Sequence, residues 1–133
     1  MIAVRWRAAA VVASLTLALA ACAPTEEDEG ASEGTPVPGA AADVEVLLSE
    51  FTIEMPDSVP AGRVAFEVSN SGSMAHNFEV EGEGIEEVLD DDLQPGDTET
   101  LTVELAPGTY TVYCPIGNHR DQGMEVQLVV TDS

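Results

Sequence analysis

The amino-acid sequence predicts an all-β protein, an antiparallel β-sandwich of about seven to eight short strands over residues 43–133. Three observations support this fold class. Apolar and polar residues alternate repeatedly with a period of two, which is typical of strands with one buried face. Turn signals that contain glycine or proline separate the alternating runs, and helical periodicity is almost absent. Short strands joined by such turns favour two packed sheets.

The first two alternating runs are "DVEVLLS", residues 43–49, and "FTIEM", residues 51–55. Every second residue is apolar in each run, so each run predicts a strand with one face toward the core. The phase of the alternation changes between the two runs. Because such a change moves the following side chains to the other face, a bulge or bend is predicted at Ser49 and Glu50.

The same alternation predicts five later strands, in residues 63–68, 76–80, 99–105, 110–114 and 124–130. The turn signals "SNSGS", "EGEG", "LQPGD" and "APGT" lie between them. The stretch "IEEVLDDDL", residues 85–93, is compatible with one short helix or with a loop. The whole chain has 133 residues, which suits a single folded domain.

The N-terminal residues have the features of an export signal. Residues 1–21 carry Arg5 and Arg7, followed by an apolar run that is too short to span a bilayer easily and ends in small residues. We therefore predict a signal peptide over residues 1–21. The sequence "LAAC" resembles a bacterial lipobox, in which the cysteine becomes the lipidated N-terminus, so Cys22 is the predicted lipidation site. The alternative is an ordinary secretory signal in which Cys22 has no role.

Residues 22–42 are predicted to form an acidic, disordered tether. They are rich in proline, glycine, alanine and acidic residues and show no apolar periodicity. Such a segment cannot bury enough apolar surface to offset the entropy lost on ordering. The tether would let the domain, residues 43–133, stand off a membrane and move. The expected location is the outer face of the cell membrane, through the lipid anchor, or the periplasm.

The charge of the chain is strongly acidic, with a formal net charge of −21. Without Arg5 and Arg7, which leave with the signal, two arginines remain against 25 acidic residues, a net charge of −23. This charge excludes nucleic acid as a partner and disfavours direct adhesion to an anionic bilayer. The acidic surface has two interpretations: it keeps the protein soluble, or it receives a basic protein partner.

Four residues carry metal-binding chemistry. Cys114, His119 and Met124 stand five positions apart, and His76 lies on an earlier predicted strand. Strand parity places His76, Cys114 and Met124 on apolar faces at strand ends, whereas His119 falls in the connecting loop. We therefore expect the four side chains to converge at one end of the sandwich core.

Each of these residues has an ordinary structural interpretation when it is taken alone. A buried cysteine is usually a small hydrophobic residue, a methionine at strand parity is usually core, and His76 suits the rim of the core. A disulfide between Cys22 and Cys114 conflicts with lipidation of Cys22 and with its place on the tether. Together, however, the only two histidines of the chain lie beside the only thiol of the domain. A thiolate, two imidazoles and a weak thioether are the ligand set of a blue-copper site.

Other chemistries fit the residues less well. Zinc accepts cysteine and histidine, but methionine is a poor zinc ligand. Cysteine–histidine nucleophilic catalysis needs an accessible thiolate, and parity points Cys114 inward. A multicopper oxidase needs many more histidines than two, and a binuclear copper centre needs two cysteines in the ligand loop, where only Cys114 is present.

Two segments resemble the cupredoxin family, which includes plastocyanin, azurin and rusticyanin. "SGSMAHNFEVEG" resembles the strand that carries the first histidine, and "APGTYTVYCPIGNHRDQGM" resembles the C-terminal ligand loop. The spacing Cys-x4-His-x4-Met is similar to that of rusticyanin and sulfocyanin. The resemblance covers about residues 43–131 and is clearest at residues 72–80 and 106–130. "GNH" stands where relatives often have Pro-Gly-His.

The resemblance implies a Greek-key sandwich and one type 1 copper ion. His76 and His119 would supply imidazole nitrogens, Cys114 the thiolate and Met124 the axial sulfur.

The resemblance also assigns two supporting residues. Asn77 would brace the ligand loop, and its amide would donate a hydrogen bond to the Cys114 sulfur. Ile116 would donate a second bond through its N–H, which Pro115 lacks. Such donors and an apolar surround stabilise Cu(I) and raise the reduction potential.

The implied function is one-electron transfer, not enzymatic catalysis. A monomer would shuttle electrons between redox partners, such as a basic cytochrome or an oxidase, at the outer face of a membrane. Two alternatives remain at this point: an extracytoplasmic copper carrier or sink, and a copper-free scaffold domain on the same fold.

Overall fold

The computed structural model describes residues 39–132, which all belong to one compact unit. The predicted signal peptide, Cys22 and most of the predicted tether lie outside the described residues. The described part contains nine strands and one 3-10 helix. They are β1 (Ala42–Ser49), β2 (Thr52–Glu54), β3 (Ser58–Pro60), β4 (Gly62–Asn70), β5 (Glu79–Gly82), β6 (Ile85–Val88), β7 (Thr98–Leu105), β8 (Gly108–Tyr113), η1 (Arg120–Gln122) and β9 (Glu125–Thr131).

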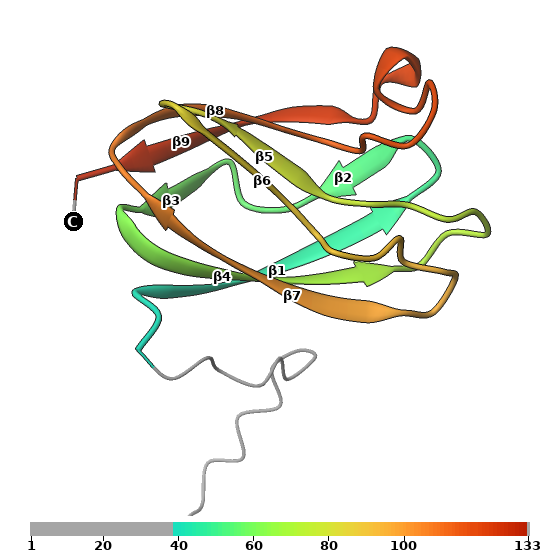
Figure 1. The fold of residues 1–133 in the computed structure, drawn as a ribbon, viewed down its shortest axis with the longest axis horizontal. Helices are drawn as coiled ribbons and strands as arrows, with labels where there is room; N and C mark the ends of the chain where they lie inside the picture. The colour runs from blue at the N-terminus through green and yellow to red at the C-terminus, as the bar shows by residue number, and fades with distance from the viewer. Residues whose placement is uncertain (1–38, 133) are drawn as a thin grey trace, which may run out of the picture. The chain divides into compact units, whose positions relative to one another are not determined.

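The strands form two sheets that face each other (Figure 1), which confirms the predicted β-sandwich. One sheet has the order β2-β1-β4-β7 and the other β3-β9-β8-β5-β6. The pairings of β1 with β4 and of β3 with β9 are parallel, whereas the other pairings between the described strands are antiparallel. Parallel neighbours need a crossover connection, and the one between β1 and β4 visits the second sheet through β3.

The core lies between the two sheets, as the alternation predicts. β1 buries Val44, Val46 and Leu48, and its neighbour β4 buries Val64, Phe66 and Val68 on the same face. The rings of Phe66 and Phe78 meet across the layers with centroids 5.4 Å apart. Burial of this apolar surface supplies most of the driving force for folding.

The predicted bulge or bend at Ser49 and Glu50 is a tight reversal of the chain. β1 and β2 pair antiparallel, with Ser49 opposite Thr52, so that only Glu50 and Phe51 connect them. The reversal accounts for the change of phase, because residues on both arms of a hairpin then face the same core. Phe51 takes a positive φ of 55° in this turn.

Residues 85–93, for which a helix or a loop was predicted, begin with the edge strand β6. Leu89 and Leu93 are buried beyond it, and their spacing of four gave the sequence its helical character. Leu93 exchanges two backbone hydrogen bonds with His76, of 2.8 and 3.0 Å. Pairing along β5 therefore prevails over helix formation.

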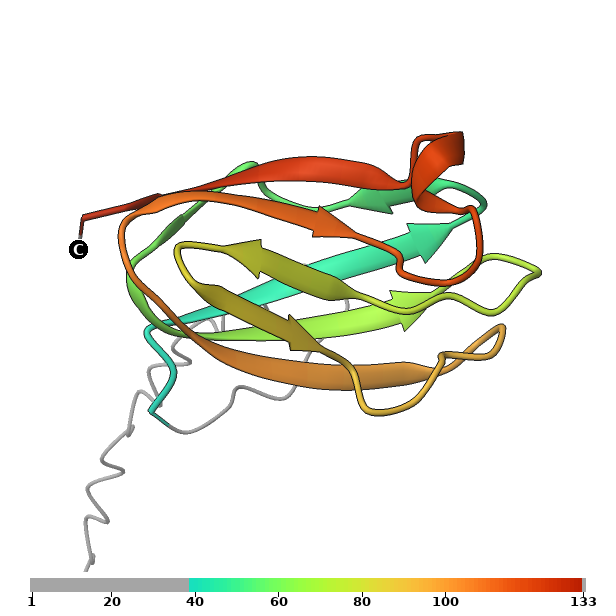
Figure 2. The ribbon, with the colours of Figure 1, turned by 45° about the horizontal axis from the view of Figure 1, so that its top comes forward.

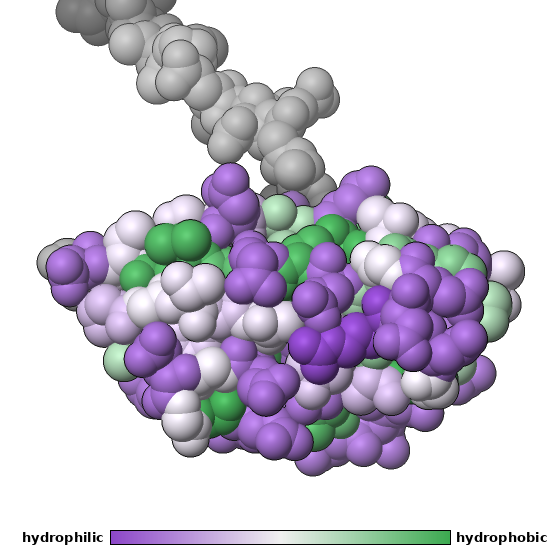
Figure 3. All heavy atoms as spheres, turned by 90° about the horizontal axis from the view of Figure 1, so that it is seen from above, coloured by the Kyte–Doolittle hydropathy of each residue, from purple (hydrophilic) through white to green (hydrophobic). Residues whose placement is uncertain are grey.

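The ends of the sandwich differ. In Figures 1 and 2, η1 and the β1–β2 turn lie at one end, whereas β1 begins and β9 finishes at the other. Seen from above, hydrophilic residues cover most of the surface and the hydrophobic residues stand in separate patches (Figure 3). Among the described residues, no helix has the length and apolar character needed to cross a bilayer.

Candidate metal centre

His76 lies just before β5 and is completely buried. Within the described part of the chain, neither of its ring nitrogens has a hydrogen-bond partner. Buried polar atoms without partners are costly and rare in folded proteins, so these nitrogens indicate a ligand. Burial lowers the pKa of His76, and the neighbouring His119 lowers it further. The neutral imidazole that a metal ion requires is therefore the favoured form.

Cys114 and His119 meet beside His76. Cys114 immediately follows β8 and is fully buried, and its Sγ lies 3.5 Å from His119 Nδ1. Potential ligand atoms of His76, Cys114 and His119 all lie within 4.8 Å of one another. The rings of the two histidines have centroids 5.1 Å apart. One sulfur and two imidazoles thus surround one point at the end of the sandwich.

Backbone hydrogen bonds close the ligand loop. Cys114 N donates to Met124 O over 3.1 Å, and Met124 N donates to His119 O over 3.2 Å. Gly117 and Gly123 take φ values of 52° and 103°, which glycine adopts without steric cost. The loop therefore turns tightly at both glycines and brings Met124, which is fully buried, back beside Cys114 and His119.

The structure thus brings the predicted ligands His76, Cys114 and His119 together. The backbone of the fourth, Met124, is hydrogen-bonded to the backbones of Cys114 and His119. Strand parity correctly placed Cys114 at the end of β8 and Met124 just before β9. His119 lies in the loop, as predicted, but only 6% of it is exposed.

The two predicted supporting residues behave differently from each other. Asn77 N donates to Cys114 Sγ over 3.4 Å, as expected. The hydrogen bonds that the structure shows for the Asn77 side-chain amide go to Asp92 Oδ1, over 2.8 Å, and to the carbonyls of Leu89 and Asp91. The Ile116 side chain packs against the core, and its carbonyl accepts a hydrogen bond from His119 N. Among the described residues, Asn77 therefore supplies the backbone N–H that donates to the Cys114 sulfur.

The β1–β2 turn is a neighbour of the centre that the sequence did not predict. The ring of Phe51 meets the ring of His119 edge to face, with centroids 5.3 Å apart and an interplanar angle of 79°. The Glu50 carboxylate accepts hydrogen bonds from Ser73 N and, over 2.9 Å, from Ser73 Oγ. Alternation marked Phe51 only as a core position, and nothing in its local sequence signals the contact with a histidine distant in the chain.

A second missed cluster holds the ligand loop from outside. The Arg120 guanidinium lies 3.8 Å from the centre of the Tyr113 ring and forms ion pairs with Glu125 and, over 3.9 Å, with Glu81. Tyr113 Oη donates to Glu79 Oε1 over 2.6 Å. Burial, and then this bond, raise the pKa of Tyr113 well above its ordinary value. These contacts attach η1 to β5, β8 and β9.

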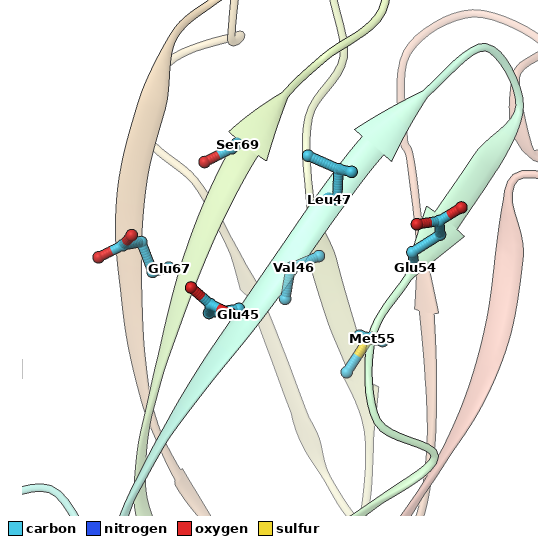
Figure 4. Close-up of a pocket in the computed structure, with 7 residues that line it drawn as sticks. All are labelled: Glu45, Val46, Leu47, Glu54, Met55, Glu67 and Ser69. Atoms are coloured by element: carbon cyan, nitrogen blue, oxygen red, sulfur yellow. The ribbon is translucent and has the colours of Figure 1, made fainter. Parts of the chain in front are cut away.

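The donor set fits copper. A buried thiol, two buried imidazoles and a buried thioether are soft and borderline ligands that serve both common oxidation states of copper. A surface groove lies elsewhere, over β1, β2 and β4 (Figure 4). It is lined by Glu45, Val46, Leu47, Glu54, Met55, Glu67 and Ser69, and none of the predicted ligands takes part. The predicted ligands themselves are buried, so the centre lies inside one end of the sandwich.

A family model described as a cupredoxin-like domain matches residues 9–130 of the chain. The matched range includes all four predicted ligands. None of the curated proteins compared with the chain matches it.

Solved structures share the fold at low sequence identity. A dithionite-reduced auracyanin from the photosynthetic bacterium Roseiflexus castenholzii is 24% identical, with a TM-score of 0.56, over 70% of this chain and 99% of its own. Auracyanin B is 19% identical, with a TM-score of 0.60, over 72% of this chain and 93% of its own. A multicopper oxidase from Campylobacter jejuni is 15% identical, with a TM-score of 0.54, over 77% of this chain but 32% of its own.

Proposed function

This chain belongs to the cupredoxin-like family, and we propose that it carries single electrons between redox proteins at the outer face of a membrane. Its cofactor is one type 1 copper ion. The observation that carries the proposal is the convergence of His76, Cys114 and His119, in which both nitrogens of a fully buried histidine have no partner among the described residues.

His76, His119 and Cys114 would hold the ion, with Met124 as a weak axial ligand. When bound, copper supplies a one-electron couple between Cu(I) and Cu(II). The protein keeps the ligands fixed: His76, Cys114 and Met124 are fully buried at strand ends, and backbone bonds tie Met124 to its neighbours. A rigid, closed ligand set rearranges little when the charge changes, which favours electron transfer.

Asn77 and His119 have separate tasks in this proposal. The Asn77 N–H bond to Cys114 Sγ stabilises the thiolate and favours the reduced state. His119 is the one predicted ligand with measurable exposure, at 6% against 0% for the others. It is therefore the proposed edge through which electrons enter and leave, with the exposed Pro115 and half-buried Ile116 beside it as contact surface.

The burial of the ligands favours an electron carrier over the copper carrier or sink considered above. A protein that delivers copper must expose its ligands to the acceptor, and here the exchange would require opening one end of the sandwich core. The two histidines of the whole chain also fall short of what a multicopper oxidase needs, so the proposed role is not that of an enzyme.

The membrane location rests on the sequence. A lipid at Cys22 would hold the chain, and the predicted tether would connect it to β1. Ala42 begins β1 at the end of the sandwich opposite to η1 (Figures 1 and 2). Because an eight-residue strand is roughly 25 Å long, the copper end would point away from the point of attachment. Redox partners would then have free access to His119. The acidic surface would attract such partners if they are basic.

One comparison of two rates tests the proposal. The copper-loaded protein is mixed either with an oxidised or reduced redox protein or with a strong Cu(I) chelator. We expect an intense visible absorption band in the oxidised form, rapid electron exchange and slow loss of copper. A colourless copper-loaded protein would refute the copper assignment. Loss of Cu(I) to the chelator within seconds, together with sluggish electron exchange, would establish the copper carrier instead.

A further inference from the structure

The turn between β1 and β2 holds a residue in an unfavourable backbone conformation. Phe51 has a φ of 55°, in the left-handed region where glycine and asparagine are usual and a bulky side chain is strained. Among the described residues, Glu83 is the other non-glycine residue with positive φ. A strained residue persists only where its surroundings fix it, and such residues gather at functional sites.

The Phe51 side chain extends from this turn to one of the predicted ligands. Its ring stands edge to face with the ring of His119, and His119 in turn meets the ring of His76 at an interplanar angle of 61°. Phe51 is half-buried and packs against the core. The three rings thus form a continuous row, in which Phe51 limits the rotation of His119.

Glu50, the other residue of the turn, holds the segment that leads to His76. Its carboxylate accepts hydrogen bonds from both the backbone N–H and the hydroxyl of Ser73. Gly72 permits this approach, because a Cβ at that position would lie 2.7 Å from Glu50 Oε1. Ser71 N also donates to Leu48 O, at the end of β1, over 2.8 Å. The segment before His76 is therefore attached to the same turn.

We infer that the Glu50–Phe51 turn is a positioning element for the copper centre, which supplies no ligand but sets how the two histidine rings lie relative to each other. Its two residues act on different predicted ligands: Glu50 holds the segment before His76, and Phe51 holds the ring of His119. This inference rests on the proposed copper site, so the first measurement is made on the metal-free protein.

The test compares Phe51→Leu, Phe51→Tyr and Glu50→Gln with the unaltered protein. Leucine keeps apolar bulk but has no ring edge, whereas tyrosine keeps the edge and should restore normal behaviour. In the metal-free Phe51→Leu protein, we expect the His119 ring to sample more than one rotamer, detected by NMR line widths and side-chain couplings. After copper loading, we expect a changed EPR hyperfine splitting and a loss of copper to a chelator that is faster by about two- to tenfold, the range that one aromatic pair supports. Glu50→Gln should broaden the signals of residues 71–76 first.

Two substitutions serve as matched controls. Met55→Ala removes a partly buried side chain that packs against the core beyond the far end of β2, and Glu83→Gly relieves positive φ in the distant β5–β6 turn. Both should change stability without changing the His119 dynamics or the EPR spectrum. If Phe51→Leu behaves like Met55→Ala, losing stability while the ring dynamics and the EPR spectrum stay unchanged, the turn is only a structural hairpin and the inference is wrong. If no copper binds to any variant, the proposed function fails, while the NMR result on the metal-free protein still decides the role of Phe51.

Discussion

The backbone N–H of Asn77 donates a hydrogen bond to Cys114 Sγ over 3.4 Å, so the residue after one predicted ligand holds the sulfur of another. Both residues are buried; Asn77 lies just before β5 and Cys114 just after β8, and these two strands are paired in the same sheet. The position of the sulfur is therefore part of the fold and does not depend on the ion.

Replacing Cys114 with serine should abolish colour and leave the fold intact. A serine hydroxyl still accepts the Asn77 bond, but it is not a thiolate, so thiolate-to-copper charge transfer is lost. We expect the visible band of the copper-loaded protein to disappear and the free energy of unfolding of the metal-free protein to fall by about 1–3 kcal/mol. Absorption spectroscopy and urea denaturation measure the two effects. A Cys114→Ser protein that keeps its colour would show that the cysteine is not a ligand.

Replacing Met124 with leucine should change the reduction potential of the site without loss of copper. The swap nearly conserves volume, so the cost in stability should stay below about 1.5 kcal/mol. Because a weak donor that favours Cu(II) is removed, the reduction potential should rise while copper and colour remain. Protein-film or titration electrochemistry gives the potential. Complete loss of copper would instead identify Met124 as a principal ligand.

Replacing Tyr113 with phenylalanine should destabilise the protein, because the buried Glu79 carboxylate loses its 2.6 Å partner. An unsatisfied buried acceptor costs about 1–3 kcal/mol. Tyr110→Phe is the matched control: it deletes a hydroxyl that donates to Ala106 O, on an exposed residue, and should cost less. Chemical denaturation of both variants checks the order, and equal losses would contradict the role given to Glu79.

The pKa of Glu50 gives an acid-pH prediction. The hydrogen bonds from Ser73, first from its N–H and then from its hydroxyl, lower this pKa from 4.5 to about 2. Because the folded value lies below the unfolded one, the charged carboxylate stabilises the fold above pH 4.5, and this contribution is lost as the pH falls from there through about 2. NMR titration of the side-chain carboxyl carbon measures the value directly. Glu50→Gln should remove this part of the acid sensitivity, and a Glu50 pKa at its ordinary 4.5 would disprove the contact.

Replacing Cys22 with serine should release the protein from membranes or block its maturation, with no change in the copper spectrum. The prediction follows from the lipobox-like sequence at this residue and from the acidic charge, which gives the domain no electrostatic hold on an anionic bilayer. Membrane fractionation and mass spectrometry of the mature N-terminus test it. An unlipidated N-terminus beyond Cys22 in the unaltered protein would refute the anchor.

Periodicity predicted the sandwich and three ligand positions because both depend on local rules. Alternation identifies which residues of a strand face the core, and it placed Cys114 and Met124 at strand ends before any strand pairing was known. The reach of the Asn77 side chain and the parallel pairing of β1 with β4 depend on which segments become neighbours. That information is spread over the whole chain.

Phe51 shows most clearly what a local sequence pattern cannot predict. The change of phase predicted a bulge or bend at Ser49 and Glu50, but nothing in the alternation indicated a full reversal of the chain or the left-handed backbone of Phe51. Local preference opposes positive φ at phenylalanine, so only tertiary contacts, with His119 and with the core, account for the conformation.

The two parallel pairings have a consequence for how the protein is made. β1 cannot pair with β4, nor β3 with β9, until the later strand of each pair has been synthesised, and β9 is the last of the described strands. Contacts between segments this far apart make folding slow, on the scale of milliseconds to seconds for sandwiches of this kind. Since Met124 directly precedes β9, we expect its sulfur to reach the other predicted ligands only once β9 has paired with β8.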